Sequence, residues 1–163
     1  MKEERFYNVI FPVWLILLYP LNLIFVLPIN FIIDYLVLRL GAKHLQIDNY
    51  KEIAKRSIIK TWLFGFLSDI IGGVMMFVFN GFAEFGLIDF VNAVMYDPFS
   101  RIDAFLAVVL CIFIAALCIY FFNLKFVFKK FDLDLAKKRR LALYLAIITA
   151  PYLFLLPTMW FVY

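Results

Sequence analysis

The sequence predicts an all-α, polytopic membrane protein: a bundle of about four transmembrane helices with an extra interfacial or kinked helical segment after the first. Two observations lead to this prediction. Hydrophobic residues make up 66% of the chain and charged residues 17%, with a mean hydropathy of +0.96, which is far from ordinary soluble composition. Four apolar regions also alternate with three stretches that carry charge. The 163 residues are expected to form a single membrane domain.

The first apolar region, residues 6–40, is too long for one upright helix and too short for two full spans. A span over residues 8–27 fits if the helix breaks at Pro28–Asn30, because proline lacks an N–H and disfavours helix at the residue before it. Residues 31–40 would then form an interfacial helix. Two alternatives stay open: one long, kinked and tilted helix, or a re-entrant hairpin turning at Pro20–Asn22.

Two polar residues of this region are candidate binding residues with simpler structural interpretations. Asp34 is expected in the opening turns of the interfacial helix, where a negative charge interacts well with the helix dipole. Asn22 is expected to hydrogen-bond to a neighbouring helix. The segment around them has no small-x-small cleavage site, so we expect it to be retained in the membrane.

Basic residues predict two cytoplasmic loops. Residues 39–60 carry six Lys or Arg against two acidic residues, and residues 124–140 carry seven against two. Residues 81–103 carry four acidic residues and one Arg, so we expect them outside, with an apolar middle on the membrane surface and a turn at Asp97–Pro98. The C-terminus is then outside. The basic loops are expected to contact anionic lipid headgroups, and no nucleic acid is expected as a partner.

The second span, residues 61–80, contains the most informative pattern. Small and polar residues recur at three- and four-residue spacing along one helix face: Gly65, Ser68, Asp69, Gly72 and Gly73. Such stripes let membrane helices approach each other closely. The third span, residues 104–123, has a matching seam that is expected to meet this stripe: Ala107, Cys111, Ala115 and Cys118. The two cysteines are expected to serve in packing.

Asp69 is the residue singled out for function. It is expected near the middle of the bilayer, where an ionisable side chain is costly unless it faces protein or water, so we expect it buried and protonated. It is either a hydrogen-bonded packing residue or a group that carries protons or binds a cation. In the first role, Asp69→Leu would cost about 1–2 kcal/mol by leaving partners unpaired. Asn80 either extends this polar side or ends the helix.

The fourth span, residues 141–161, contains Pro151 and Pro157 and ends in aromatic residues that are typical of the outer interface. Nothing in the chain resembles a catalytic motif. His44, the only histidine, has no partner for a metal site, and neither a metal nor a cofactor is expected.

Three functions are compatible with these observations. The first is an accessory or interaction subunit whose small-residue seams dock a membrane partner or a second copy. The alternative is a small oligomeric transporter or channel component in which Asp69, with Asn80 or Asn22, lines a polar path. The third is a lipid-facing enzyme or lipid-binding protein that uses the basic loops and Asp34. A short polytopic chain without a targeting signal favours a bacterial plasma membrane.

Overall fold

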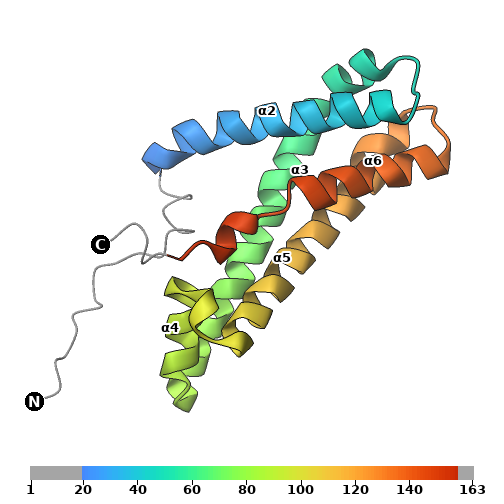
Figure 1. The fold of residues 1–163 in the computed structure, drawn as a ribbon. Helices are drawn as coiled ribbons and strands as arrows, with labels where there is room; N and C mark the ends of the chain where they lie inside the picture. Colours follow the sequence, from blue (N-terminus) through green and yellow to red (C-terminus); the bar gives the residue numbers. More distant parts are fainter. Residues whose placement is uncertain (1–19, 158–163) are drawn as a thin grey trace, which may run out of the picture.

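The computed structural model describes residues 20–157, and all regular secondary structure in this range is helical, which confirms the all-α prediction for these residues. The α-helices are α2 (Pro20–His44), α3 (Tyr50–Val78), α4 (Ile88–Tyr96), α5 (Ile102–Phe122) and α6 (Leu135–Ile148). Shorter 3-10 segments cover Phe79–Phe85, Pro98–Ser100, Phe128–Lys130 and Tyr152–Leu155, and a π-helical segment covers Asn123–Val127. Helix α3 runs beside α5, and α2 runs beside α6 (Figure 1). Helix α4 lies beside the start of α5, at the end of the molecule away from the turn that follows α2.

Two helical segments are long and apolar enough to cross a membrane, by length and composition: Tyr50–Phe85 and Ile102–Lys130. Only 22% and 28% of their most apolar windows are buried inside the structure. Many of their large apolar side chains instead lie on the outer surface, among them Leu63, Val74 and Phe113. An apolar outer surface of this kind suits contact with lipid.

Helix α2 continues through Pro28, so the predicted break at Pro28–Asn30 and the separate interfacial helix over 31–40 are wrong. Proline removes only the hydrogen bond to the carbonyl four residues before it, and packing against a neighbouring helix lets a membrane helix retain it. Helix α2 is held against α3 at this level, where the indole N–H of Trp62 donates to the Leu27 carbonyl at 3.0 Å. The part of the predicted first span before residue 20, which decides between a crossing and a hairpin, lies outside the described residues.

Helix α3 begins before the predicted second span, because the basic segment from Tyr50 onward joins it as one continuous helix. Asn49 occupies the N-cap position, although its side chain makes no capping hydrogen bond. Glu52 instead pairs with Arg56 one turn later at 2.7 Å. Helix α5 covers Ile102–Phe122, close to the segment expected at 104–123.

The segment predicted as the fourth span, residues 141–161, is not one continuous helix, because α6 ends at Ile148. Proline disfavours helical geometry at the residue before it, and Pro151 therefore stops the helix at the bend that includes Ala150. A short 3-10 helix over Tyr152–Leu155 follows the bend. Residues 158–161 lie outside the described part of the chain.

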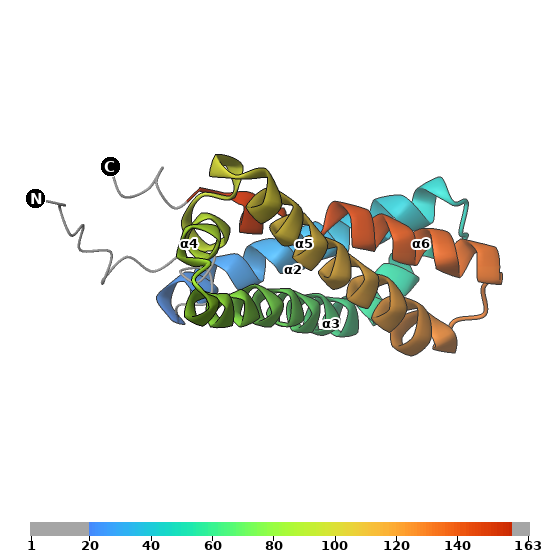
Figure 2. The same ribbon diagram turned by 90° about the horizontal axis from the view of Figure 1, so that it is seen from below.

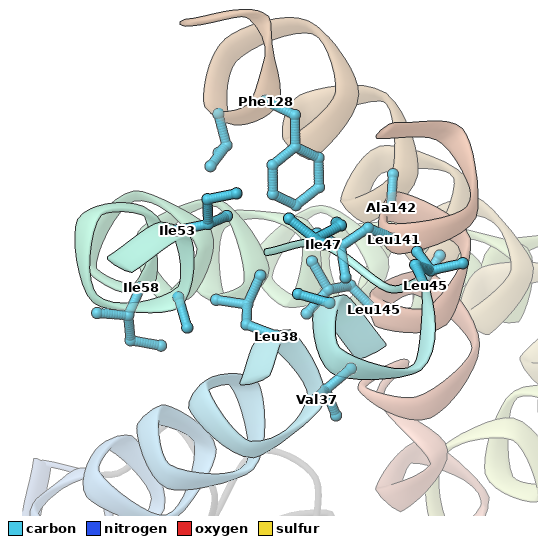
Figure 3. Close-up of a cluster of buried hydrophobic side chains, with 14 of the residues drawn as sticks. Val37, Leu38, Leu45, Ile47, Ile53, Ile58, Phe128, Leu141, Ala142 and Leu145 are labelled. Carbon is cyan, nitrogen blue, oxygen red and sulfur yellow. The ribbon is translucent and has the colours of Figure 1, made fainter. Parts of the chain in front are cut away.

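Two clusters of buried apolar side chains hold the helices together. The first joins α2, α3, α6 and the segment after α5, and Figure 3 shows Leu38, Ile58, Phe128 and Leu141 from these elements around it. The second joins α3, α4, α5 and the segment after α6: Met76, Val94, Val108, Cys111 and Phe154 are among its members. Along α3, the residues that line the cavity described below, such as Trp62 and Asp69, lie between the parts of the helix that belong to the two clusters.

The two basic segments lie at the same end of the molecule. Figures 1 and 2 both show the turn after α2 beside the loop before α6. Lys137 Nζ donates to the Gln46 carbonyl at 3.2 Å, and Lys130 Nζ donates to the Arg56 carbonyl at 3.3 Å. The acidic stretch is at the opposite end, where the Asp97 carboxylate accepts from the Phe99 N–H at 3.2 Å in the predicted turn.

Candidate carboxyl site

A cavity of about 280 Å³ lies where α2, α3 and the segment after α6 meet. Its polar lining comes from four side chains on three elements: Asn30 and Asp34 from α2, Asp69 from α3, and Thr149 at the end of α6. The rest of the wall is apolar or aromatic. We call this space the carboxyl cavity.

The apolar side of α2 faces the outer surface of the helix bundle, and Asp34, on the other side of the helix, faces the bundle interior. Ile32 and Leu36 are 56% and 46% exposed, whereas Asp34 is 5% exposed. In water this arrangement would be inverted, but a helix in lipid directs its apolar side chains outward and its ionisable ones toward the bundle interior. Asp34 therefore occupies the middle of α2 and faces protein, not the opening turn of an interfacial helix as predicted from the sequence.

A glycine on α3 makes room for the Asp34 carboxyl. A Cβ placed on Gly65 would lie 3.5 Å from Asp34 Oδ2, with no other heavy atom of a neighbouring residue within 4 Å. The Thr149 hydroxyl donates to the Leu145 carbonyl at 2.9 Å and lies within hydrogen-bonding reach of the Asp34 carboxyl. A hydroxyl has one proton to donate, so it can donate to only one of these two acceptors at a time.

Asp69 lies close to the middle of the candidate span Tyr50–Phe85. Its Oδ1 atom is buried and has no hydrogen-bond partner. The Asp34 and Asp69 carboxyls interact electrostatically across the cavity. None of the described residues that line the cavity is basic. The cavity thus holds two acidic groups, Asp34 buried and Asp69 half-buried, and no positive side chain among the described lining residues balances them.

Three aromatic residues complete the wall. Trp62 and Phe66 come from α3 and Tyr152 from the segment after α6. Trp62 is held in place by its hydrogen bond to Leu27 and by an edge-on contact with Phe31, whose ring centroid is 6.0 Å from its own. Trp62 is therefore anchored to the same helix that carries Asp34.

The structure brings together some of the residues singled out from the sequence and separates others. Asp34, Asp69 and Gly65 share the carboxyl cavity. Asn80 lies in the 3-10 segment after α3 and does not line it. The side chain of Asn22 lies outside the described part of the chain. Thr149 was missed, since the sequence marks it only as a residue shortly before a proline.

The small residues farther along α3 pack against α5. A Cβ on Gly72 would lie 3.1 Å from Ala115 Cβ, 3.4 Å from the Cys111 carbonyl oxygen and 2.9 Å from the ring of Phe154. Ser68 and Gly73 are also buried, and the Ser68 hydroxyl donates to the Phe64 carbonyl of its own helix at 2.7 Å. On α5, Cys111 and Ala115 are buried and Ala107 and Cys118 are half-buried; both cysteines are free.

A second cavity of about 440 Å³ lies between α5 and α6 and is almost wholly apolar. Among the described residues, no group of three or more His, Cys, Asp or Glu side chains could hold a metal ion. No protein-family model, curated protein or solved structure matches this chain. The chemistry of the carboxyl cavity is therefore the most direct indication of function.

Proposed function

We propose that this protein is a small integral membrane protein that binds cations, protons included, at the carboxyl cavity and transfers them across the bilayer. One observation supports this most strongly: two carboxyls from separate helices line one cavity, and none of the lining residues that the structure describes is basic. Two negative charges in one cavity repel each other, and a proton or another cation entering the cavity relieves that repulsion.

The environment of Asp69 favours this proposal over a packing role. A packing aspartate inside a membrane bundle is expected to pair with another side chain or with a backbone group. Asp69 Oδ1 is buried and has no such partner. Leaving a buried polar atom unpaired costs about 1–3 kcal/mol, a cost that a structural residue would avoid.

The accessory-subunit hypothesis draws less support from the structure. It depended on small-residue seams being free to dock another protein. Gly72, Cys111 and Ala115 instead pack against one another inside this chain. A membrane-protein partner or a second copy would therefore have to use other surfaces, such as the exposed apolar side chains of α5.

Within this proposal the chain forms a four-span bundle in a bacterial plasma membrane, with its basic end in the cytoplasm and its C-terminus outside. The contacts that join the two basic segments at one end support the orientation, because Lys and Arg accumulate on the cytoplasmic side. The same residues would contact anionic lipid headgroups. Cysteines introduced at Asp97 and Lys137 should react with impermeant reagents from opposite sides of the membrane.

Proton flux into vesicles tests the proposed function. The full chain is reconstituted into liposomes that contain a pH-sensitive dye, and a potassium diffusion potential imposed with valinomycin drives protons inward. Wild type should acidify the lumen faster than protein-free liposomes, and Asp69→Asn and Asp34→Asn should return the rate to that background. Asp132→Asn, the same change at an exposed loop position, should behave like wild type. Equal rates for wild type and Asp69→Asn would contradict the proposal.

A further inference from the structure

We infer that the carboxyl cavity is built for a small, free organic cation, an alkyl-substituted ammonium, and not only for a proton or a metal ion. This inference rests on the proposed function, since it names the class of cation that the same site takes. It follows from the size of the cavity, the chemistry of its wall and the nature of its rim.

The size of the cavity exceeds what a proton or a bare metal ion requires. A volume of about 280 Å³ corresponds to about nine water molecules at about 30 Å³ each. A hard metal cation needs about six oxygen ligands close around it. Among the described lining residues, the side-chain oxygens belong to two carboxyls, one amide and the hydroxyls of Thr149 and Tyr152, and they are spread over three elements around a space much wider than one ion. A ligand with its own bulk fills this space better than an ion.

The wall combines negative charge with aromatic rings. Trp62, Phe66 and Tyr152 line the cavity together with the two carboxyls. Aromatic faces attract ammonium groups through their negative electrostatic potential, and tryptophan does so most strongly. The Asn30 amide and the Thr149 hydroxyl add oxygen atoms with partial negative charge to the lining. Carboxylates with aromatic rings and no basic side chain are the surroundings that an alkylammonium group prefers.

The rim of the cavity is apolar and lies on the outer surface. Ile29, Ile148 and Leu153 line the cavity and are 54%, 55% and 47% exposed. On a helix bundle in a bilayer, such residues face lipid. A cation with alkyl substituents partitions into the bilayer more readily than a metal ion and can enter past these side chains.

A zwitterionic lipid headgroup is a poorer occupant than a free cation. A phosphocholine group would bring a phosphate close to two carboxyls, and none of the described lining residues is basic. The negative phosphate would then be repelled without compensation. The free cation is therefore the form that the cavity accepts.

Calorimetric titration with tetraethylammonium chloride tests the inference. The full chain in a maltoside detergent should bind tetraethylammonium, and an equal concentration of sodium chloride should give no comparable binding. Asp34→Asn and Asp69→Asn should each weaken binding about tenfold or more, the equivalent of about 1.4 kcal/mol. Asp132→Asn should bind like wild type. Circular dichroism and thermal unfolding of each variant show that lost binding is not lost fold.

A second pair of variants tests the aromatic wall. Phe66→Leu keeps an apolar side chain in the wall but removes the ring, and should weaken tetraethylammonium binding about two- to fivefold, as expected for one cation–π contact. Phe77→Leu is the matched control on the same helix, because Phe77 is exposed and does not line the cavity. A short-chain phosphatidylcholine added to the detergent should not displace tetraethylammonium.

Each contrary result has a defined meaning. The inference is wrong if tetraethylammonium fails to bind, binds no better than sodium, is displaced by the phosphatidylcholine, or binds equally to the wild type and both Asn variants. If any of these occurs while vesicle acidification still depends on Asp69, the proposed function stands and only the ligand class fails. If tetraethylammonium binding depends on both carboxyls but no flux is seen, cation binding stands and the proposed transfer fails.

Discussion

Two glycines on the same face of α3 have different surroundings: Gly65 borders the carboxyl cavity, and Gly72 lies at a close contact with α5. Gly65 and Gly72 lie seven residues apart on the same side of α3, about 10 Å apart along its axis. At Gly65 an added Cβ would approach only the Asp34 carboxyl, at 3.5 Å. At Gly72 it would press on the Phe154 ring at 2.9 Å and on Ala115 Cβ at 3.1 Å. The first glycine leaves a cavity beside a polar group, and the second allows two helices to touch.

The difference shows that a small-xxx-small pattern does not by itself identify a packing surface. What decides is the element that crosses at each level: α2 with a buried carboxyl at the first, and α5 with Cys111 and Ala115 at the second. Asp69 lies between Gly65 and Gly72 along α3 and, like Gly65, lines the carboxyl cavity. One sequence stripe therefore combines a candidate binding site with a close helix contact.

The largest expected effect on stability comes from adding a methyl group at Gly72, where α3 and α5 are in close contact. Gly72→Ala should lower the free energy of unfolding by about 1–2 kcal/mol, because overpacking costs up to about 3 kcal/mol and better helix propensity returns about 1. Chemical unfolding in detergent measures this. A variant as stable as wild type would show that α3 and α5 do not approach closely at Gly72.

Asp69→Leu distinguishes a hydrogen-bonded packing aspartate from one that binds cations. Since Asp69 Oδ1 has no hydrogen-bond partner, leucine leaves no group unpaired and removes a poorly solvated carboxyl. We expect the free energy of unfolding to stay the same or to rise by about 1 kcal/mol, which replaces the loss expected from the sequence. The same variant should lose proton flux. A clear loss of stability in the same unfolding assay would instead indicate a hydrogen-bonded packing aspartate.

The smallest effect on stability is expected at Gly65, beside the carboxyl cavity. Gly65→Ala places a methyl group at ordinary contact distance from the Asp34 carboxyl, so the helix propensity of alanine should raise stability by up to about 1 kcal/mol. The methyl group also narrows the carboxyl cavity, so tetraethylammonium binding should weaken. Thermal unfolding and calorimetry on the one variant measure both effects. If Gly65→Ala destabilises as much as Gly72→Ala, the two levels do not differ.

Composition and local pattern were enough to predict the helices of α3 and α5 and the joint location of the basic segments. Long runs of apolar residues and clustered charges are local signals, and membrane insertion depends on them directly. Local signals failed at Pro28, because the contact that holds α2 against α3 at this level, the hydrogen bond from Trp62 to the Leu27 carbonyl, comes from another helix. In the last predicted span, α6 ends at Ile148, shortly before Pro151, so the helix is shorter than the segment of residues 141–161.

The sequence identified the two carboxyls of the candidate site but not their meeting in one cavity. Asp69 stood out because an acidic residue inside an apolar run is rare, and the same reasoning marked Asp34. Their meeting in one cavity depends on where α2 crosses α3, and no spacing along the chain encodes that crossing. Thr149 carries no signal of its own, because its role arises from the end of a helix that packs against the other two.

The central claim is that Asp34 and Asp69 share one cavity, and a double-mutant cycle tests it most directly. The free energy of unfolding is measured in detergent, at mildly alkaline pH, for wild type, Asp34→Asn, Asp69→Asn and the double variant. Each single change removes the repulsion between the carboxyls, so the effects should not add. We predict that the double variant falls short of the sum of the singles by about 0.5–3 kcal/mol. Additivity within about 0.3 kcal/mol would mean that the two carboxyls do not meet, and would contradict this account.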